Sequence, residues 1–134
     1  MQRTEFEKLV EEGYERLPQW VREKIKNVAI LVEDEPSDEV RKQEELSGDE
    51  TLLGLYHGIP LAARGENYGV GMTMPDTITL YQLPIEEAAE MLGVYEITKF
   101  QDAVKKVVAE TIWHEFAHHF GMDEGEVRRR EEDR

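Results

Sequence analysis

The sequence predicts a single α+β domain over residues 1–134, and the order of its apolar patterns is the reason. Apolar residues recur at helical spacing near the beginning of the chain and again near its end. Between these two patterns lie three short runs rich in branched and aromatic side chains, which are typical of strands. Strands that are grouped together and followed by a mainly helical second half of the chain indicate an α+β fold.

The first part of the chain predicts two helices and a strand. A helix is expected over residues 4–17, and Thr4 with Glu7 resembles a capping box at its start. Pro18 then ends this helix or begins a short second one. Residues 27–32 form an apolar run rich in branched side chains, which predicts a buried strand.

The middle of the chain predicts two further strands and two connecting loops. Residues 33–50 are dominated by acidic side chains with few basic ones, so we expect an exposed, mobile loop there. Strands are expected over residues 52–56 and 77–81, because both runs are rich in apolar and β-branched side chains. Several glycines lie between them and predict a loop over residues 64–75.

The last part of the chain predicts helices. A helix is expected over residues 85–92, with Gly93 as its end. A longer helix should cover residues 98–120, followed by Gly121 as a natural terminating residue. Residues 125–134 are almost entirely charged and form a tail that is expected to fray.

Composition excludes several classes of function. There are 30 acidic residues against 16 basic ones, for a net charge of −14, and this field repels nucleic acid and anionic lipid. The negative charge is compatible with a basic peptide partner, and it also promotes solubility. No apolar run approaches the ~20 residues that span a membrane, and the first residues lack the apolar core of a signal peptide, so we expect a cytoplasmic protein. The chain has no cysteine, which excludes disulfides, cysteine-ligated zinc and thiol nucleophiles.

One motif carries the chemistry. His114, Glu115 and His118 form an HExxH pattern within the predicted long helix. Residues i and i+4 lie on one face of a helix, so the two imidazoles can bind one Zn²⁺ ion at ~2.0–2.1 Å. Glu115 lies about 100° further round the helix, where it can hold a water molecule and act as a general base.

A catalytic zinc ion needs a third protein ligand, and the residues after the motif provide candidates. Gly121 can adopt a positive φ angle and turn the chain back toward the metal. Glu124 follows three residues later and is the expected third ligand, with Asp123 as the alternative. An HExxH pattern alone also arises in proteins that bind no metal. Here the positions of Gly121 and of the carboxylates that follow it favour a metal site.

The other histidines and the aromatic residues of this helix have plainer interpretations. His119 lies off the ligand face, so a packing or hydrogen-bonding role is expected for it, and the isolated His57 is expected at the surface. A stripe of apolar residues at helical spacing should form part of the core: Ala109, Ile112, Trp113, Phe116, Ala117 and Phe120.

These residues resemble a known family. The sequence HEFAHHFGMDE, from His114 to Glu124, is similar to the HExxHHFGxxD motif of the small bacterial zincin-like metallopeptidases, whose fold is a minimal zincin fold. Residues 53–61 (LGLYHGIPL) and 74–81 (MPDTITLY) resemble two strands of the same family. The resemblance covers roughly residues 50–125, and it departs from the family where Glu124 replaces the usual Asp.

The resemblance implies a small sheet packed against helices, with a substrate cleft beside an edge strand. Gly54, Leu55 and Tyr56 are the expected substrate-binding residues on that edge, because peptides commonly bind by adding a strand. The implied function is a zinc-dependent metallopeptidase that hydrolyses peptide bonds in a peptide or protein substrate. The alternative is a metal-binding interaction module of zincin fold that lacks peptidase activity.

Overall fold

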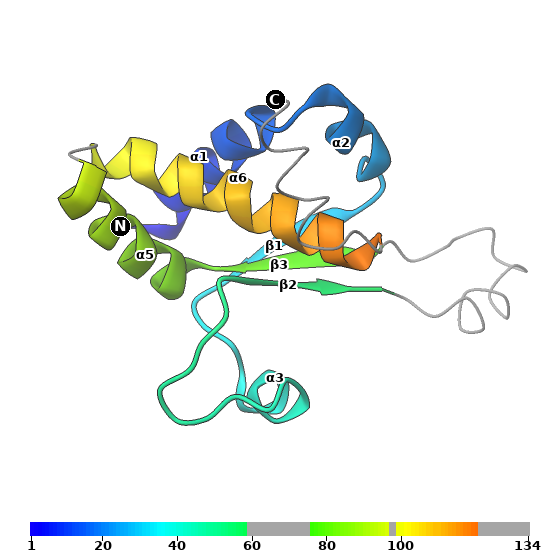
Figure 1. Cartoon of the computed structure of the whole chain (residues 1–134), viewed down its shortest axis with the longest axis vertical. Helices are drawn as coiled ribbons and strands as arrows, with labels where there is room; N and C mark the ends of the chain where they lie inside the picture. Colours follow the sequence, from blue (N-terminus) through cyan, green and yellow to red (C-terminus); the bar gives the residue numbers. More distant parts are fainter. Residues whose placement is uncertain (59–75, 97–98, 121–134) are drawn as a thin grey trace, which may run out of the picture.

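The computed structural model describes residues 1–58, 76–96 and 99–120 of the chain. Helices and strands are both present, which confirms the α+β fold (Figure 1). The strands are β1 (Ala29–Glu33), β2 (Gly54–His57) and β3 (Thr77–Tyr81). The described helices are α1 (Arg3–Glu15), α2 (Gln19–Lys24), α3 (Asp38–Gln43), α5 (Gln82–Glu96) and α6 (Phe100–His119).

The three strands form a mixed sheet in the order β1-β3-β2. β1 runs parallel to β3 with Ile30 opposite Ile78, and β2 runs antiparallel to β3 with Tyr56 opposite Ile78. β3 is therefore the central strand, and its Ile78 and Leu80 side chains are fully buried. Among the described strands, β1 and β2 are the two edges, so Gly54, Leu55 and Tyr56 lie on an edge strand as predicted.

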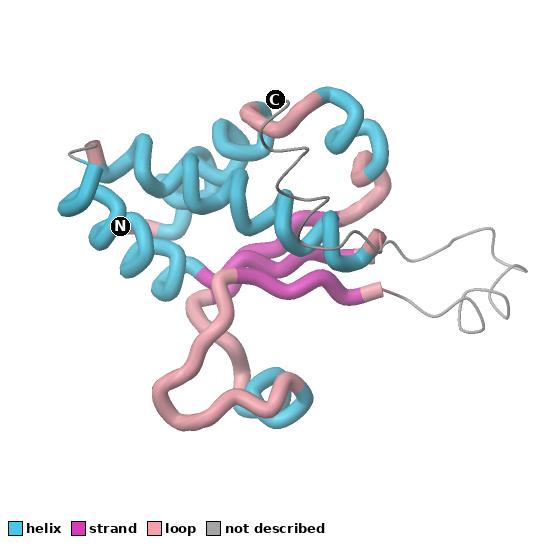
Figure 2. The backbone as a smooth tube through the Cα atoms, in the orientation of Figure 1, coloured by secondary structure: helices cyan, strands magenta, loops and turns pink. Residues whose placement is uncertain are grey.

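The helices α1, α5 and α6 lie on one side of the sheet, while α3 lies on the other (Figures 1 and 2). α6 contributes most to the core, because the side chains of Val104, Val108, Ile112 and Trp113 are fully buried. The ring of Trp20 meets the ring of Trp113 edge-on, with their centroids 5.6 Å apart. The predicted apolar stripe of α6 is thus core, except that Phe120 is 45% exposed at the end of the helix.

The ends of the helices α1 and α5 differ from the prediction. Gln2 is the N-cap of α1 and no side chain caps that end, so Thr4 and Glu7 form no capping box. α5 begins at Gln82, earlier than predicted, and it continues through Gly93 to Glu96. A single glycine costs a helix only about 1 kcal/mol, which the packing of α5 against α6 can outweigh.

The predicted acidic loop over residues 33–50 contains the helix α3. The Ser37 hydroxyl caps it by accepting a hydrogen bond from the Val40 amide at 3.2 Å. Acidic residues occupy its first turn and basic residues, Arg41 and Lys42, its last, which is the order that a helix dipole favours. This serine and the order of the charges are sequence signals for a helix, which the overall acidity of the segment concealed.

Some predictions fall on residues outside the described ranges: the loop over residues 64–75, the helix end at Gly121 and the charged tail over residues 125–134. Among the described residues, no helix is both long enough and apolar enough to cross a membrane.

Candidate metal centre

The two histidines of the motif lie one turn apart near the end of α6. Both side chains are exposed, because the buried stripe that includes Trp113 and Phe116 occupies another face of the helix. The ring centroids of His114 and His118 are 6.5 Å apart, and the ring planes are inclined at 65°. A small rotation of the two side chains would bring one nitrogen of each toward a shared ion, so this pair fits two of the ligands of a zinc site.

Glu115 lies between these histidines and the sheet. Its carboxylate oxygen Oε1 accepts a hydrogen bond of 2.9 Å from the backbone N–H of Tyr56 in β2. Burial raises the pKa of Glu115 above its ordinary value, while the Tyr56 N–H and the neighbouring histidines act in the opposite direction. The glutamate is therefore held next to the histidine pair in an environment that favours proton uptake.

The edge of β2 that faces away from β3 runs beside this glutamate. The amide of Tyr81 donates to the carbonyl of Leu53, so in the antiparallel ladder Leu55 also faces β3 while Gly54 and Tyr56 direct their N–H and C=O groups away from it. Of the three predicted substrate-binding residues, Gly54 can thus pair through its backbone with an added strand. The N–H of Tyr56 is already bonded to Glu115.

Gly54 allows β2 to approach α6 closely. A Cβ atom at this position would lie 2.8 Å from Cγ2 of Thr111, which is closer than real Cβ atoms come, and 3.0 Å from the carbonyl oxygen of Thr79. Thr111 precedes Glu115 by four residues and therefore lies on the same face of α6. The missing side chain of Gly54 is what lets Glu115 reach the backbone of β2.

A second set of contacts fixes Tyr56 itself. The Tyr56 ring stacks on the His119 ring, with centroids 3.7 Å apart and planes inclined at 13°. The Tyr56 hydroxyl donates a 2.9 Å hydrogen bond to Asp76, and Nε2 of His119 lies 3.9 Å from the same carboxylate oxygen. This agrees with the packing role predicted for His119. The part played by Asp76 and Tyr56 in holding it was not predicted, because the three residues are distant in sequence.

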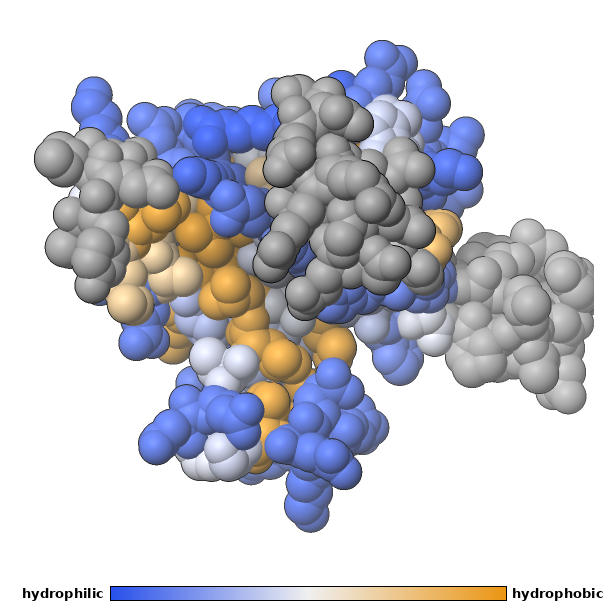
Figure 3. Space-filling view, viewed as in Figure 1, coloured by the Kyte–Doolittle hydropathy of each residue, from blue (hydrophilic) through white to orange (hydrophobic). Residues whose placement is uncertain are grey.

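An apolar groove leads to the histidine pair. It has a volume of about 430 Å³ and lies between β2, α5 and α6, with His114 and Glu115 on its wall. In Figure 3 apolar surface extends over this part of the molecule, from α5 and α6 down to the segment that precedes β2. Its apolar lining consists of side chains from these elements: Leu52, Leu53, Ala88, Leu92 and Val107.

The described part of the chain supplies two of the predicted metal ligands. The alternative third ligands, Glu124 and Asp123, lie outside the described residues. Within residues 1–58, 76–96 and 99–120, no three His, Asp or Glu side chains form a group that could hold a metal ion. His57 lies at the exposed end of β2, as expected for a surface histidine.

A protein-family model described as zincin-like metallopeptidase matches residues 25–134 of the chain. The match includes all three strands, α6 and both candidate third ligands. No curated protein matches the chain.

Proposed function

The chain belongs to the zincin-like metallopeptidase family, and from this premise we propose that it is a zinc-dependent peptidase. The observation that supports the proposal most is the placement of Glu115, which lies beside the His114 and His118 pair and touches the edge of the sheet. When bound, zinc would act as a Lewis acid on the scissile carbonyl and lower the pKa of a water molecule toward ~7. Glu115 would accept the proton of the attacking water and pass it to the leaving amine.

The proposed substrate is a peptide in extended conformation along β2. The outward-facing backbone groups of Gly54 would pair with it, as in other cases of strand addition. One substrate side chain would then enter the apolar groove that reaches His114 and Glu115. The groove favours an apolar residue at that position because its floor consists mainly of leucine, valine and alanine side chains.

We expect Glu124→Ala to weaken zinc binding more than Asp123→Ala does. The reason is the offset of three residues after Gly121, at which the chain would return toward the histidine pair. Zinc content of both purified variants, measured by elemental analysis after dialysis, provides the comparison. Loss of zinc from the Asp123 variant alone would make Asp123 the third ligand.

The proposed activity is tested with the zinc-loaded protein and a broad peptide library analysed by mass spectrometry. We expect cleavage that a chelator stops and added zinc restores, with an apolar residue enriched on one side of the cleaved bond. A protein that binds zinc but cleaves no member of the library would favour the alternative function, a metal-binding interaction module.

A further inference from the structure

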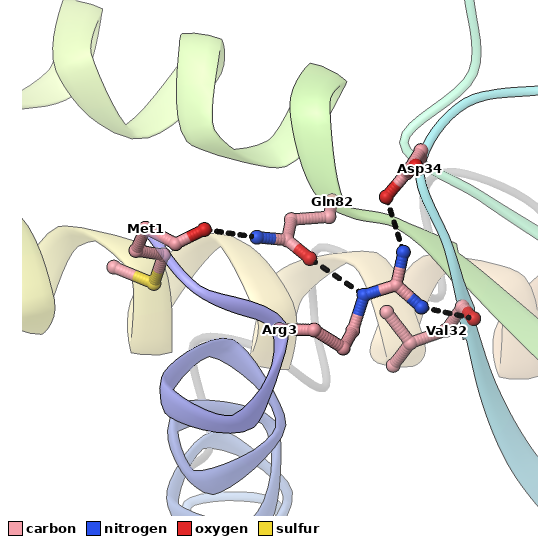
Figure 4. A network of polar contacts seen from close by, with 5 residues as sticks. All are labelled: Met1, Arg3, Val32, Asp34 and Gln82. Atoms are coloured by element: carbon pink, nitrogen blue, oxygen red, sulfur yellow. Dashed lines mark hydrogen bonds and ion pairs between the residues drawn. The ribbon is translucent and has the colours of Figure 1, made fainter.

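The sheet has a second edge, β1, on the side away from the metal centre. The amide of Ala29 donates to the carbonyl of Asp76, so in this parallel pair residues 30 and 32 direct their backbone groups away from β3. The guanidinium of Arg3 donates a 3.1 Å hydrogen bond to the Val32 carbonyl from that outer side (Figure 4). The N–H and C=O of Ile30 and the N–H of Val32 have no hydrogen-bond partner among the described residues.

An open groove of about 540 Å³ lies beside this edge, between β1 and α1. The side chains of Ile30 and Val32 in β1, and of Val28 just before it, line this groove, and each is only half-buried. Val10 and Tyr14 of α1 line the opposite wall. The groove therefore has an apolar floor that α1 leaves partly uncovered.

The rim of the groove on α1 is acidic. Glu7, Glu11 and Glu15 succeed one another every four residues, line the groove and are all exposed. None of the three forms an ion pair or hydrogen bond with a described residue, whereas Glu12 on the same helix pairs with Lys105 at 2.7 Å. The groove also contains the Nε–H of Arg22, which is buried and has no hydrogen-bond acceptor among the described residues.

The acidic rim and the strand edge have matching periods. Arg3 at the start of α1 contacts Val32 near the end of β1, and the groove is lined from Glu7 to Glu15 on the helix side and from Val28 to Val32 on the strand side. Glutamates four residues apart on a helix recur about every 6 Å along its axis. Side chains on one face of a strand recur about every 6.6–6.8 Å, so alternate side chains of an added strand would lie opposite successive glutamates.

We propose that this groove binds an extended basic segment of another protein, which adds to β1 as a fourth strand. Lysine or arginine at every second position would lay its aliphatic part on the floor formed by Val28, Ile30 and Val32 and pair its charge with Glu7, Glu11 and Glu15. The backbone of the segment would bond to both backbone groups of Ile30 and to the N–H of Val32, whose C=O is held by Arg3. One carbonyl of the segment would accept the Nε–H of Arg22. This surface is separate from the metal centre, because β3 lies between β1 and β2.

The test uses a labelled twelve-residue peptide of alternating Lys and Thr, with fluorescence anisotropy as the readout. We expect the triple variant Glu7→Gln, Glu11→Gln, Glu15→Gln to lose roughly tenfold or more in affinity, because three exposed ion pairs are removed together. The matched control carries Glu23→Gln, Glu39→Gln and Glu90→Gln, which remove the same charge from exposed positions outside the groove. This control should bind the peptide with an affinity within about twofold of that of the unmodified protein, when both are measured at the same ionic strength.

Two further measurements separate strand addition at β1 from other modes of binding. Two further peptides are N-methylated on the backbone, one at every Lys and the other at every Thr. Only one of them should lose binding, because alternate amides of a strand face opposite edges. The amides of Ile30 and Val32 should gain protection from hydrogen exchange when the peptide binds. Equal losses of peptide affinity in the two triple variants would overturn the proposal. Loss of peptide binding in the His114→Ala variant would also overturn it, because the peptide would then bind at the metal centre.

Discussion

Zinc content is expected to fall from close to one ion per chain to near zero when His114 is replaced by alanine. Among the described residues, the motif provides two zinc ligands, His114 and His118. Without His114, one imidazole and one carboxylate would remain, which is too few ligands for tight zinc binding. The His114 side chain is exposed and alanine is a better helix former than histidine, so the fold should survive. Elemental analysis after dialysis, with circular dichroism to monitor folding, measures the effect.

His57→Ala is the matched control for that experiment. This side chain is also an exposed imidazole, but it lies at the end of β2 and outside the motif. Its removal should leave the zinc content unchanged. A folded His114 variant that keeps its full zinc content would show that the zinc binds elsewhere on the chain.

Glu115→Gln is expected to leave zinc bound and the protein folded while hydrolysis falls by a factor on the order of 10²–10⁴, the usual cost of losing a general base. Glutamine keeps the shape of the side chain, and its amide oxygen can still accept the hydrogen bond from Tyr56 N–H. It cannot accept a proton at neutral pH. The rate is measured on a peptide that the unmodified, zinc-loaded protein cleaves.

Glu87→Gln is the charge-matched control. Glu87 is an exposed residue of α5 that does not line the apolar groove, so its replacement removes one negative charge without removing the proposed base or a groove residue. The control should keep nearly full activity. Equal cleavage by the Glu115 variant and the unmodified protein would assign the activity to another residue or to a contaminant.

Local sequence patterns predicted most of the secondary structure because they depend on neighbouring residues. The alternation in Thr77–Tyr81 predicted β3 with its observed bounds. The apolar spacing of residues 98–120 predicted α6, and the HExxH spacing placed His114 and His118 on one side of it. The short helix α3 within the acidic segment was missed, because the net charge of the segment was considered before its capping serine and the order of its charges.

The sequence by itself determined the family, the α+β elements and the relation between His114, Glu115 and His118, since a helix fixes the relation between residues i and i+4. Only the tertiary structure decided what surrounds these residues. The contact between Glu115 and Tyr56 spans 59 positions, and it depends on the close approach that Gly54 permits between β2 and α6. The stacking of His119 on Tyr56 and the groove beside β1 likewise join elements that are distant along the chain. Such contacts follow from how helices and strands pack, and no spacing within one element specifies them.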